Sequence, residues 1–349
     1  IKITISMYFE MYIYLMKNIQ YSLLELATLK KNNTAADAIE RASQGARHID
    51  KLGYTRIWLA EHHNMEFIAS SATSVLIGHI ASQTKNIRVG SGGIMLPNHS
   101  PLVIAEQFGT LESIYPNRID LGLGRAPGTD QVTAMALRRN NLNTAFYFKD
   151  DVQSLQRYFS QENHSSKVRA FPGEGLDIPI WILGSSTDSA FLAAELGLPY
   201  AFAAHFAPNM LKAASEIYRM NFKPSEQLQE PYFMVCVNII AADSNEEALF
   251  LSSSLQNLFA GIVTNRRMPL SPPTEKTIFH GIPEIEQAVQ SMTSSTYTGS
   301  PEQLAKSLQE LIDEVHAQEI MTTNYIYDDE KRLKSFELIK ETFDLINQR

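Results

Sequence analysis

Cysteine is almost absent from this chain, since Cys236 is the single cysteine among 349 residues. One thiol can form neither an internal disulfide nor a multi-cysteine metal site, so we expect a cytoplasmic protein without such a metal centre. Cys236 lies in the apolar run Y-F-M-V-C-V-N-I-I and is interpreted as a small buried core residue.

An excess of basic residues is missing as well. The chain has 30 Lys and Arg against 38 Asp and Glu, which gives a net charge of −8 and a sequence pI near 5.6. Proteins that bind nucleic acid carry a basic face, so this balance excludes that class from our expectations. A small-molecule substrate is expected instead.

The sequence also lacks a hydrophobic run long enough for a transmembrane helix. Residues 1–15 are apolar, but they contain Glu10 and are too short to cross a bilayer. They carry no small-residue cleavage site, so no signal peptide is predicted. Because Met16-Lys17-Asn18 is typical of a chain start, we expect residues 1–15 to lie outside the fold and residues 16–349 to form one domain.

Strand-like and helix-like segments alternate along the rest of the chain. The expected strands cover residues 19–24, 55–60, 87–92, 118–123, 178–183, 200–204, 232–241 and 320–327. The expected helices cover residues 35–52, 70–82, 102–114, 144–159, 189–196, 208–221, a segment from 246, 301–316 and 331–347. Eight strand–helix units predict an α/β fold of the (β/α)₈ TIM-barrel type, with insertions after strands 4 and 7. The alternative, an open doubly wound sheet, should show a glycine fingerprint after the first strand, and none is there. Residues 262–282 are expected to form a long loop, which is a candidate lid.

Polar residues follow directly after several of these strands, where parallel α/β proteins carry their chemistry. The second strand runs into Glu61-His62-His63. Adjacent strand residues point to opposite faces, so the two histidines are poorly placed to bind one metal ion. An imidazole at a barrel mouth is a suitable acid–base group, and His62 is the better candidate. The alternative is a polar loop with one packed histidine.

Two further strand ends carry glycine or arginine. Gly90-Ser91-Gly92-Gly93 predicts either a bulge or close approach of the backbone to a flat ligand. Arg125 follows the fourth strand, where its guanidinium could hold a phosphate or form a weak surface salt bridge.

The fifth strand gives the strongest local signal. It ends at Gly184 and leads through Ser185, Ser186 and Ser189 into an alanine-rich helix. Free N–H groups, a positive dipole end and several hydroxyls favour a phosphate cradle. Ordinary N-capping by Ser185 or Ser186 is the simpler alternative.

These motifs together resemble the bacterial luciferase-like, flavin-dependent monooxygenase family, in its single-chain branch. The resemblance covers residues 19–347 and is carried by W-L-A-E-H-H-N-M, R-V-G-S-G-G-I-M-L-P, A-E-Q-F-G-T-L-E-S-I-Y-P-N-R-I-D-L-G-L-G-R-A-P-G, G-S-S-T-D-S-A and Y-T-G-S-P-E-Q-L-A. It implies a TIM barrel that uses reduced FMN and O₂, through a flavin C4a-peroxide, to oxidise an organic substrate.

The same resemblance assigns roles to individual residues. His62 matches the histidine that assists chemistry beside the flavin, and Gly92-Gly93 matches a non-proline cis peptide against the flavin ring. Arg125, Gly184, Ser185, Ser186 and Ser189 match the phosphate site.

The resemblance also implies partners, and it leaves alternatives open. The chain has no obvious second nucleotide site, so a separate flavin reductase is expected to supply reduced FMN. A homodimer through the helices beside strands two and three is expected from the resemblance alone. Two alternatives remain: a non-catalytic flavin-binding protein, and a deazaflavin-dependent oxidoreductase on the same barrel.

Overall fold

A computed structural model describes residues 18–126, 128–138 and 144–348 of the chain. The residues predicted to form an N-terminal extension, 1–15, lie outside the described part. The described strands are β1 (Gln20–Glu25), β2 (Arg56–Leu59), β3 (Arg88–Met95), β4 (Ile119–Gly124), β5 (Ile180–Gly184), β6 (Tyr200–Ala203), β7 (Phe233–Ala241), β8 (Thr296–Gly299) and β9 (Glu319–Thr323).

Eight of the strands in the described chain close into a parallel barrel. The sheet runs β6-β5-β4-β3-β2-β1-β9-β7, and the additional pairing of β6 with β7 closes the ring. Strand β8 pairs only with the far half of β7 and lies outside the ring. The predicted TIM barrel is therefore confirmed.

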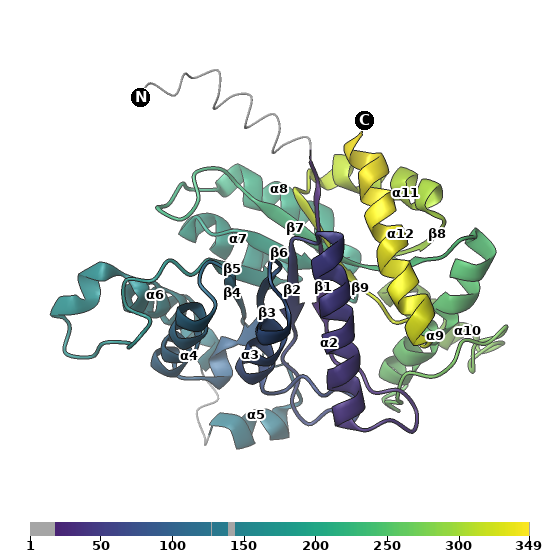
Figure 1. The fold of residues 1–349 in the computed structure, drawn as a ribbon, viewed down its shortest axis with the longest axis horizontal. Coiled ribbons are helices and arrows are strands. Elements are labelled where there is room, and N and C mark those ends of the chain that lie inside the picture. Colours follow the sequence, from purple (N-terminus) through teal and green to yellow (C-terminus); the bar gives the residue numbers. More distant parts are fainter. Residues whose placement is uncertain (1–17, 127, 139–143, 349) are drawn as a thin grey trace.

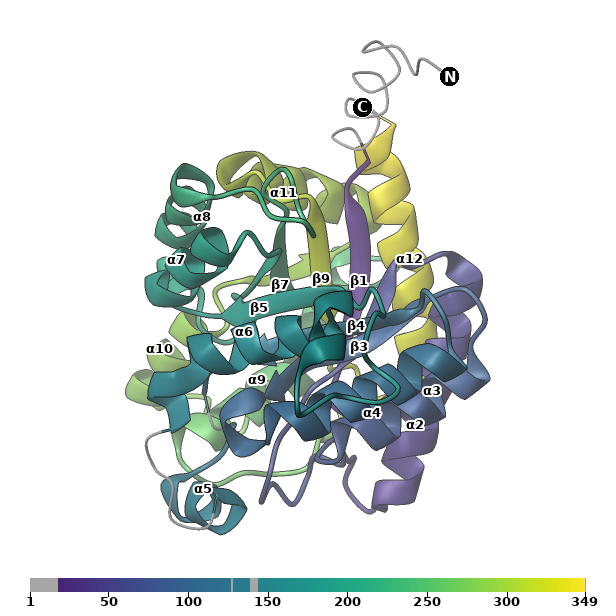
Figure 2. The same ribbon diagram turned by 90° about the vertical axis from the view of Figure 1, so that its left-hand side faces the viewer.

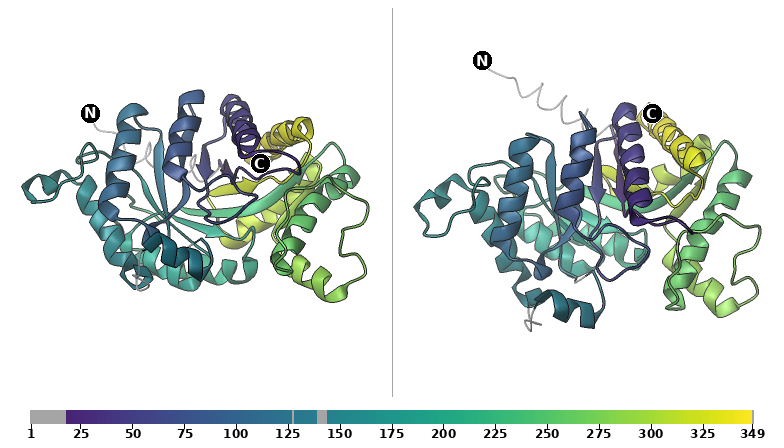
Figure 3. Two further views of the ribbon diagram at one scale, coloured as in Figure 1. Left: turned by 90° about the horizontal axis from the view of Figure 1, so that it is seen from below. Right: turned by 60° about the horizontal axis from the view of Figure 1, so that its bottom comes forward.

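Helices surround this barrel, as the view from below in Figure 3 shows. They are α2 (Ala35–Leu52), α3 (Thr73–Gln83), α4 (Pro101–Ile114), α5 (Gln131–Arg138), α6 (Phe148–Phe159), α7 (Thr187–Leu196), α8 (Leu211–Asn221), α9 (Asn245–Val263), α10 (Pro283–Met292), α11 (Pro301–Val315) and α12 (Asp329–Asn347), with short 3₁₀ helices at Leu96–Asn98, Thr144–Tyr147, Gln161–Ser165 and Pro208–Met210. Figure 2 shows α4 and α6 packed side by side on one flank. In Figure 1, α5 and α10 lie at the end of the molecule opposite the C-terminal end of α12. No helix in the described ranges is long and apolar enough to cross a membrane.

Helix α2 shows how the local sequence fixes an element. Thr34 and Asp37 form a reciprocal capping box at its start, and Gly53 ends it with a left-handed φ of 80°. Both ends coincide with the predicted ones, because side-chain caps and an αL glycine are short-range signals.

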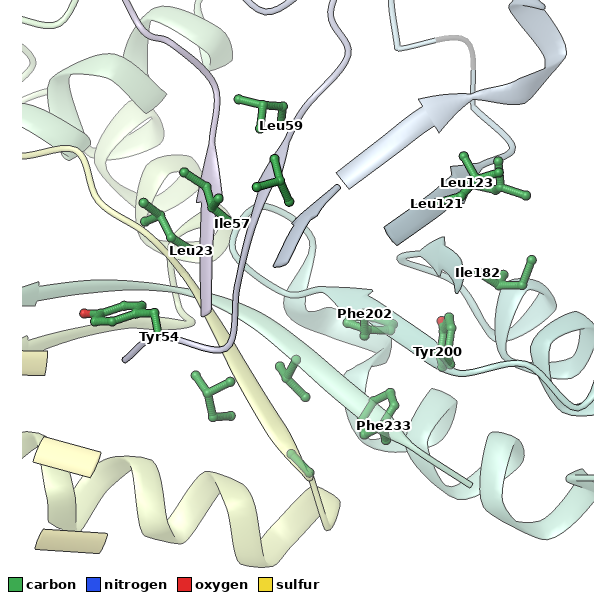
Figure 4. Packing of buried hydrophobic residues seen from close by; sticks show 14 of the residues in the cluster. Leu23, Tyr54, Ile57, Leu59, Leu121, Leu123, Ile182, Tyr200, Phe202 and Phe233 are labelled. Carbon is green, nitrogen blue, oxygen red and sulfur yellow. The ribbon is translucent and has the colours of Figure 1, made fainter. Parts of the chain in front are cut away.

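Side chains of the strands alternate between two apolar layers. Leu23, Ile57 and Leu59 point outward and pack under the helices, with residues of the other strands around them (Figure 4). Leu24 and Trp58 point inward, where they meet the other members of a smaller cluster inside the barrel. Because successive side chains on a strand point to opposite faces, each strand contributes to both the outer core and the barrel interior.

Several elements differ from the sequence-based expectations. The eighth barrel strand ends at Thr323, not at residue 327, and residues 144–159 divide into a 3₁₀ turn and α6. Asp150 and Asp151 lie in the first turn of α6, where acidic residues favour a helix start. The short elements α5, α10 and β8 were not predicted from the sequence.

Candidate functional site

A cavity of about 390 Å³ opens at the carboxyl ends of the barrel strands. Each of the residues predicted for the site lines it: His62, Gly92, Gly93, Arg125, Gly184, Ser185, Ser186 and Ser189. Its floor is formed by side chains of the barrel interior, including Leu24, Trp58 and Cys236. The predicted residues come from four different strand ends, so the closed barrel brings them together although they span more than a hundred positions in sequence.

Strand β3 bends at the two predicted glycines. The peptide bond between Gly92 and Gly93 is cis, and the register with β4 shifts between Ser91 and Ile94. A Cβ on Gly92 would lie 2.7 Å from Leu24 Cδ1, and a Cβ on Gly93 would lie 2.8 Å from the carbonyl oxygen of Gly122. Protein packing therefore requires glycine at both positions, whether or not a ligand lies against them.

His62 lies at the end of β2 and lines the cavity. Its Nδ1 lies 3.4 Å from the carbonyl oxygen of Gly128. A carbonyl only accepts, so the geometry assigns the proton to Nδ1 and leaves Nε2 as an acceptor. Burial lowers the pKa of His62, and the nearby charge of Arg267 lowers it further. The imidazole is therefore neutral near pH 7 and suited to accept a proton.

His63 does not line this cavity and turns to Glu61. The Glu61 carboxylate is buried and accepts hydrogen bonds from His63 Nε2 at 2.8 Å, His99 Nε2 at 2.9 Å and the Met95 amide at 3.0 Å. The ligand atoms of the two histidines and Glu61 lie within 4.8 Å of one another, a spacing that would suit a metal ion. The hydrogen bonds already satisfy the buried carboxylate, so we interpret the cluster as a brace between the ends of β2 and β3.

The start of α7 forms the other end of the cavity. Ser186 is the N-cap and accepts from the Ser189 amide, so the simpler alternative from the sequence also holds. Ser189 Oγ donates to the Ser186 carbonyl at 2.7 Å and lies 2.9 Å from the Tyr200 hydroxyl. These contacts fix the turn, and the first amides of a helix have no acceptor within the helix.

Arg125 extends over this turn from the end of β4. Its Nη2 lies 3.4 Å from Asp188, and the two side chains are 48% and 70% exposed. An exposed pair of this kind contributes little, so the guanidinium can exchange Asp188 for an anion at small cost. Helix dipole, hydroxyls and guanidinium together fit a phosphate group.

His205, which follows β6, was missed by the sequence analysis. It is buried and lines the cavity, and its Nδ1 has no hydrogen-bond partner among the described residues. Burial and the nearby His62 lower the pKa of His205 to about 3, so it is neutral. Its position directly after a strand is the same signal that identified His62. A buried imidazole nitrogen without a partner fits a site that takes a polar ligand.

A second chamber of about 300 Å³ adjoins the first, and His62 and His205 line both. Its other lining residues are mostly apolar: Leu26, Met65, Phe67, Ile68, Phe206, Leu258, Phe259, Ile262, Met268, Met292 and Tyr325, with Thr28, Glu66 and Arg267 as the polar members. Most of them come from the loop after β2, from α9 and from the segment beyond it, which includes part of the predicted lid, and the others follow β1, β6 and β9 or lie at the end of α10.

The first chamber offers one surface for a flat ring system and another for a phosphate group. The apolar barrel floor can take a flat ring system, and the α7 turn with Arg125 can take the phosphate. The second chamber leaves room for an apolar compound beside His62 and His205.

Comparisons with known proteins agree with this fold. A family model described as luciferase-like monooxygenase matches residues 21–315. A luciferase-like monooxygenase of Escherichia coli K12 is 51% identical over 322 residues, which cover 92% of this chain and 96% of the relative. N-acetyl-S-alkylcysteine monooxygenase of Bacillus subtilis is 34% identical over 236 residues, which cover 66% of this chain and 70% of that protein. The crystal structure of apo-MsnO8 superposes with a TM-score of 0.84 at 31% identity, covering 94% of this chain and 99% of that one.

Proposed function

The chain belongs to the luciferase-like monooxygenase family, and from this premise we propose that it is an FMN-dependent oxygenase that receives reduced FMN from a separate reductase. Reduced FMN, when bound, supplies the two electrons with which O₂ gives one oxygen atom to an organic substrate and the other to water. The observation that carries the proposal is one cavity with a phosphate cradle at one end and a neutral histidine at the other.

The roles of the residues follow from their positions. Ser185, Ser186, Ser189 and Arg125 would hold the phosphate, and Gly92 with Gly93 would form the wall beside the ring. His62 would accept a proton at Nε2, because its Nδ1 is occupied by the Gly128 carbonyl.

The partners belong to the same proposal. The cavity contains one phosphate cradle in the described residues, and a nicotinamide nucleotide would need a second, which supports an external reductase. We also propose a homodimer through α3 and α4, since Val75, Val103 and Ile114 expose apolar surface on these two helices. Residues 16–349 would act as one domain.

Titration of the purified protein with oxidised and then photoreduced FMN under anaerobic conditions, followed by a pulse of O₂, tests the function. Tight binding of reduced FMN and its rapid consumption of O₂ would support the oxygenase. Binding without any reaction with O₂ would favour a flavin-storage or deazaflavin function instead. Absence of binding in both redox states would refute the flavin assignment.

A further inference from the structure

The second chamber has the size of a small organic molecule. Its volume of about 300 Å³ lies at the lower end of the range of pockets that bind small organic molecules. Apolar side chains form most of its wall, so burying an apolar ligand there would be favourable. The chamber therefore selects a compact, largely apolar compound.

One cation without a counter-charge lies at the rim of this chamber. Arg267 lines it and has no carboxylate oxygen within 4.0 Å among the described residues. Arg267 is exposed, unlike the buried arginines Arg41, Arg56 and Arg332, which all have such a partner. A guanidinium beside an apolar wall offers charge-assisted hydrogen bonds to a carboxylate or another planar anion.

Arg267 also lies close to the chemistry. Its positive charge lowers the pKa of His62, so the guanidinium acts electrostatically on the histidine at the junction of the two chambers. An anion bound to Arg267 would therefore lie near His62.

The carboxylate of Glu66 lines the chamber as well, so a cationic ligand is the competing possibility. Glu66 is exposed and forms no ion pair in the described part of the chain. Arg267 is one of the charges that shift the pKa of His62 most, and Glu66 is not. We therefore assign the ligand to Arg267 and treat a cation at Glu66 as the competing outcome of the test.

We propose that the second chamber binds the substrate as an amphiphilic monoanion, with a compact apolar body and one anionic group held by Arg267. The identification of this ligand as the substrate rests on the proposed function. Binding itself does not depend on that function, because the chamber is formed by protein side chains alone.

Calorimetric titration of the flavin-free protein with three probes of equal length tests the proposal: octanoate, octan-1-ol and octylamine. We expect octanoate to bind most tightly, and Arg267→Gln to weaken its binding about tenfold while octan-1-ol changes by less than about twofold. Arg267→Lys keeps the charge and should restore most of the affinity. Glu66→Gln is the matched control and should not weaken octanoate binding.

The length of the apolar body gives an independent measurement. From hexanoate to octanoate, affinity should rise about fourfold for each methylene and then level off when the chamber is full. A preference for octylamine that Glu66→Gln abolishes would overturn the proposal in favour of a cationic ligand. Octanoate affinity that does not change in Arg267→Gln, or absence of octanoate binding, would refute it.

A parallel titration with photoreduced FMN separates this result from the proposed function. Arg267 lies outside the FMN cavity, so its variants should bind FMN like the wild type. Octanoate binding without FMN binding would refute the proposed function and support the anion site. FMN binding without octanoate binding would support the proposed function and refute the anion site.

Discussion

His62 and His63 are adjacent in the chain but face different surroundings. His62 lines both chambers, whereas His63 donates to the buried Glu61 carboxylate. Because neighbouring side chains at the strand end point in opposite directions, His62 faces the cavity and His63 faces Glu61. A substitution at either position should therefore affect a different property.

Replacing His62 by alanine should reduce turnover about 10²-fold to 10⁴-fold and leave the affinity for reduced FMN unchanged. Burial lowers the pKa of His62, so the acid limb of kcat should lie below the ordinary histidine value of about 6.5. As pH falls through the lowered pKa, Nε2 becomes protonated and can no longer accept a proton. A pH–rate profile of both proteins, measured with a turned-over substrate, would show the limb in the wild type alone. Equal turnover in the variant would remove His62 from the mechanism.

Replacing Glu61 by glutamine should lower stability at neutral pH by about 1–3 kcal/mol, because the carboxylate holds two histidines and a backbone amide. Burial alone would raise the pKa of Glu61, but the bonds from His99, His63 and Met95 lower it below its ordinary value. A depressed pKa stabilises the fold above the unfolded-state value of about 4.3, and this stability is lost as pH falls through the folded-state pKa.

Urea midpoints of the wild type and Glu61→Gln should therefore differ by a constant amount above about pH 4.3 and converge below it, when the pH is lowered from about 7 to about 2.5. The exposed Glu341 on α12 provides a control, since Glu341→Gln should leave the midpoint unchanged at every pH. A difference for Glu61→Gln that stays constant over the whole range would contradict the ionic role.

At the scale of elements, α4 packs so closely against the turn before β5 that only glycine fits at one position. A Cβ on Gly109 would lie 2.3 Å from Gly173 Cα and 2.5 Å from Gly173 N. These are backbone atoms and cannot move aside as a flexible side chain can. Helix propensity favours alanine over glycine by up to about 1 kcal/mol. For Gly109→Ala, propensity therefore predicts a gain in stability and packing predicts a loss.

Gly109→Ala should therefore destabilise the protein by more than about 2 kcal/mol, as overpacking against backbone does. Gly78→Ala in α3 is the matched control, because its Cβ would meet only Leu111 Cδ2 at 3.3 Å. The control should be neutral or stabilising by up to about 1 kcal/mol. Thermal unfolding of the two variants decides the question, and equal shifts in both would contradict the packing argument.

The elements also show what the sequence can predict. Strands with continuous apolar runs and helices with clear caps, such as α2, were located to within a few residues. Strand β8 has only four residues and α10 follows a long loop. Neither segment could be recognised in the sequence from a repeating pattern of apolar residues. His62, Arg125 and the α7 turn could be predicted as site residues because each follows a strand, and a parallel barrel brings the carboxyl ends of its strands together.

The rest of the site depends on contacts that no local pattern encodes. Glu61 and His99 are 38 positions apart, and their pairing requires β2 and β3 to be in register. Arg267 lies on an irregular loop that reaches the chamber only in the folded chain. His205 carried the same strand-end signal as His62 but lacked a flanking motif.

At the scale of the whole molecule, an ion network crosses the barrel interior. Arg56 on β2 contacts Asp120 on β4 at 2.7 Å and Glu319 on β9 at 2.9 Å. Asp120 also accepts from Arg88, and Glu319 from the Tyr232 hydroxyl at 2.9 Å. Burial alone would lower the pKa of Arg56, but the two carboxylates raise it. The network thus joins strands that are far apart in sequence and helps to set the closure of the ring.

Arg56→Met should destabilise the protein by about 3–5 kcal/mol, because it leaves two buried carboxylates without their shared cation. Lys212→Met, at an ion pair whose side chains are 64% and 53% exposed, should change stability by less than about 1 kcal/mol. Urea unfolding of both variants measures the contrast. A small loss for Arg56→Met would mean that apolar packing alone closes the barrel. A loss confined to Arg56→Met would mean that the buried ion network helps to hold β2, β4 and β9 together.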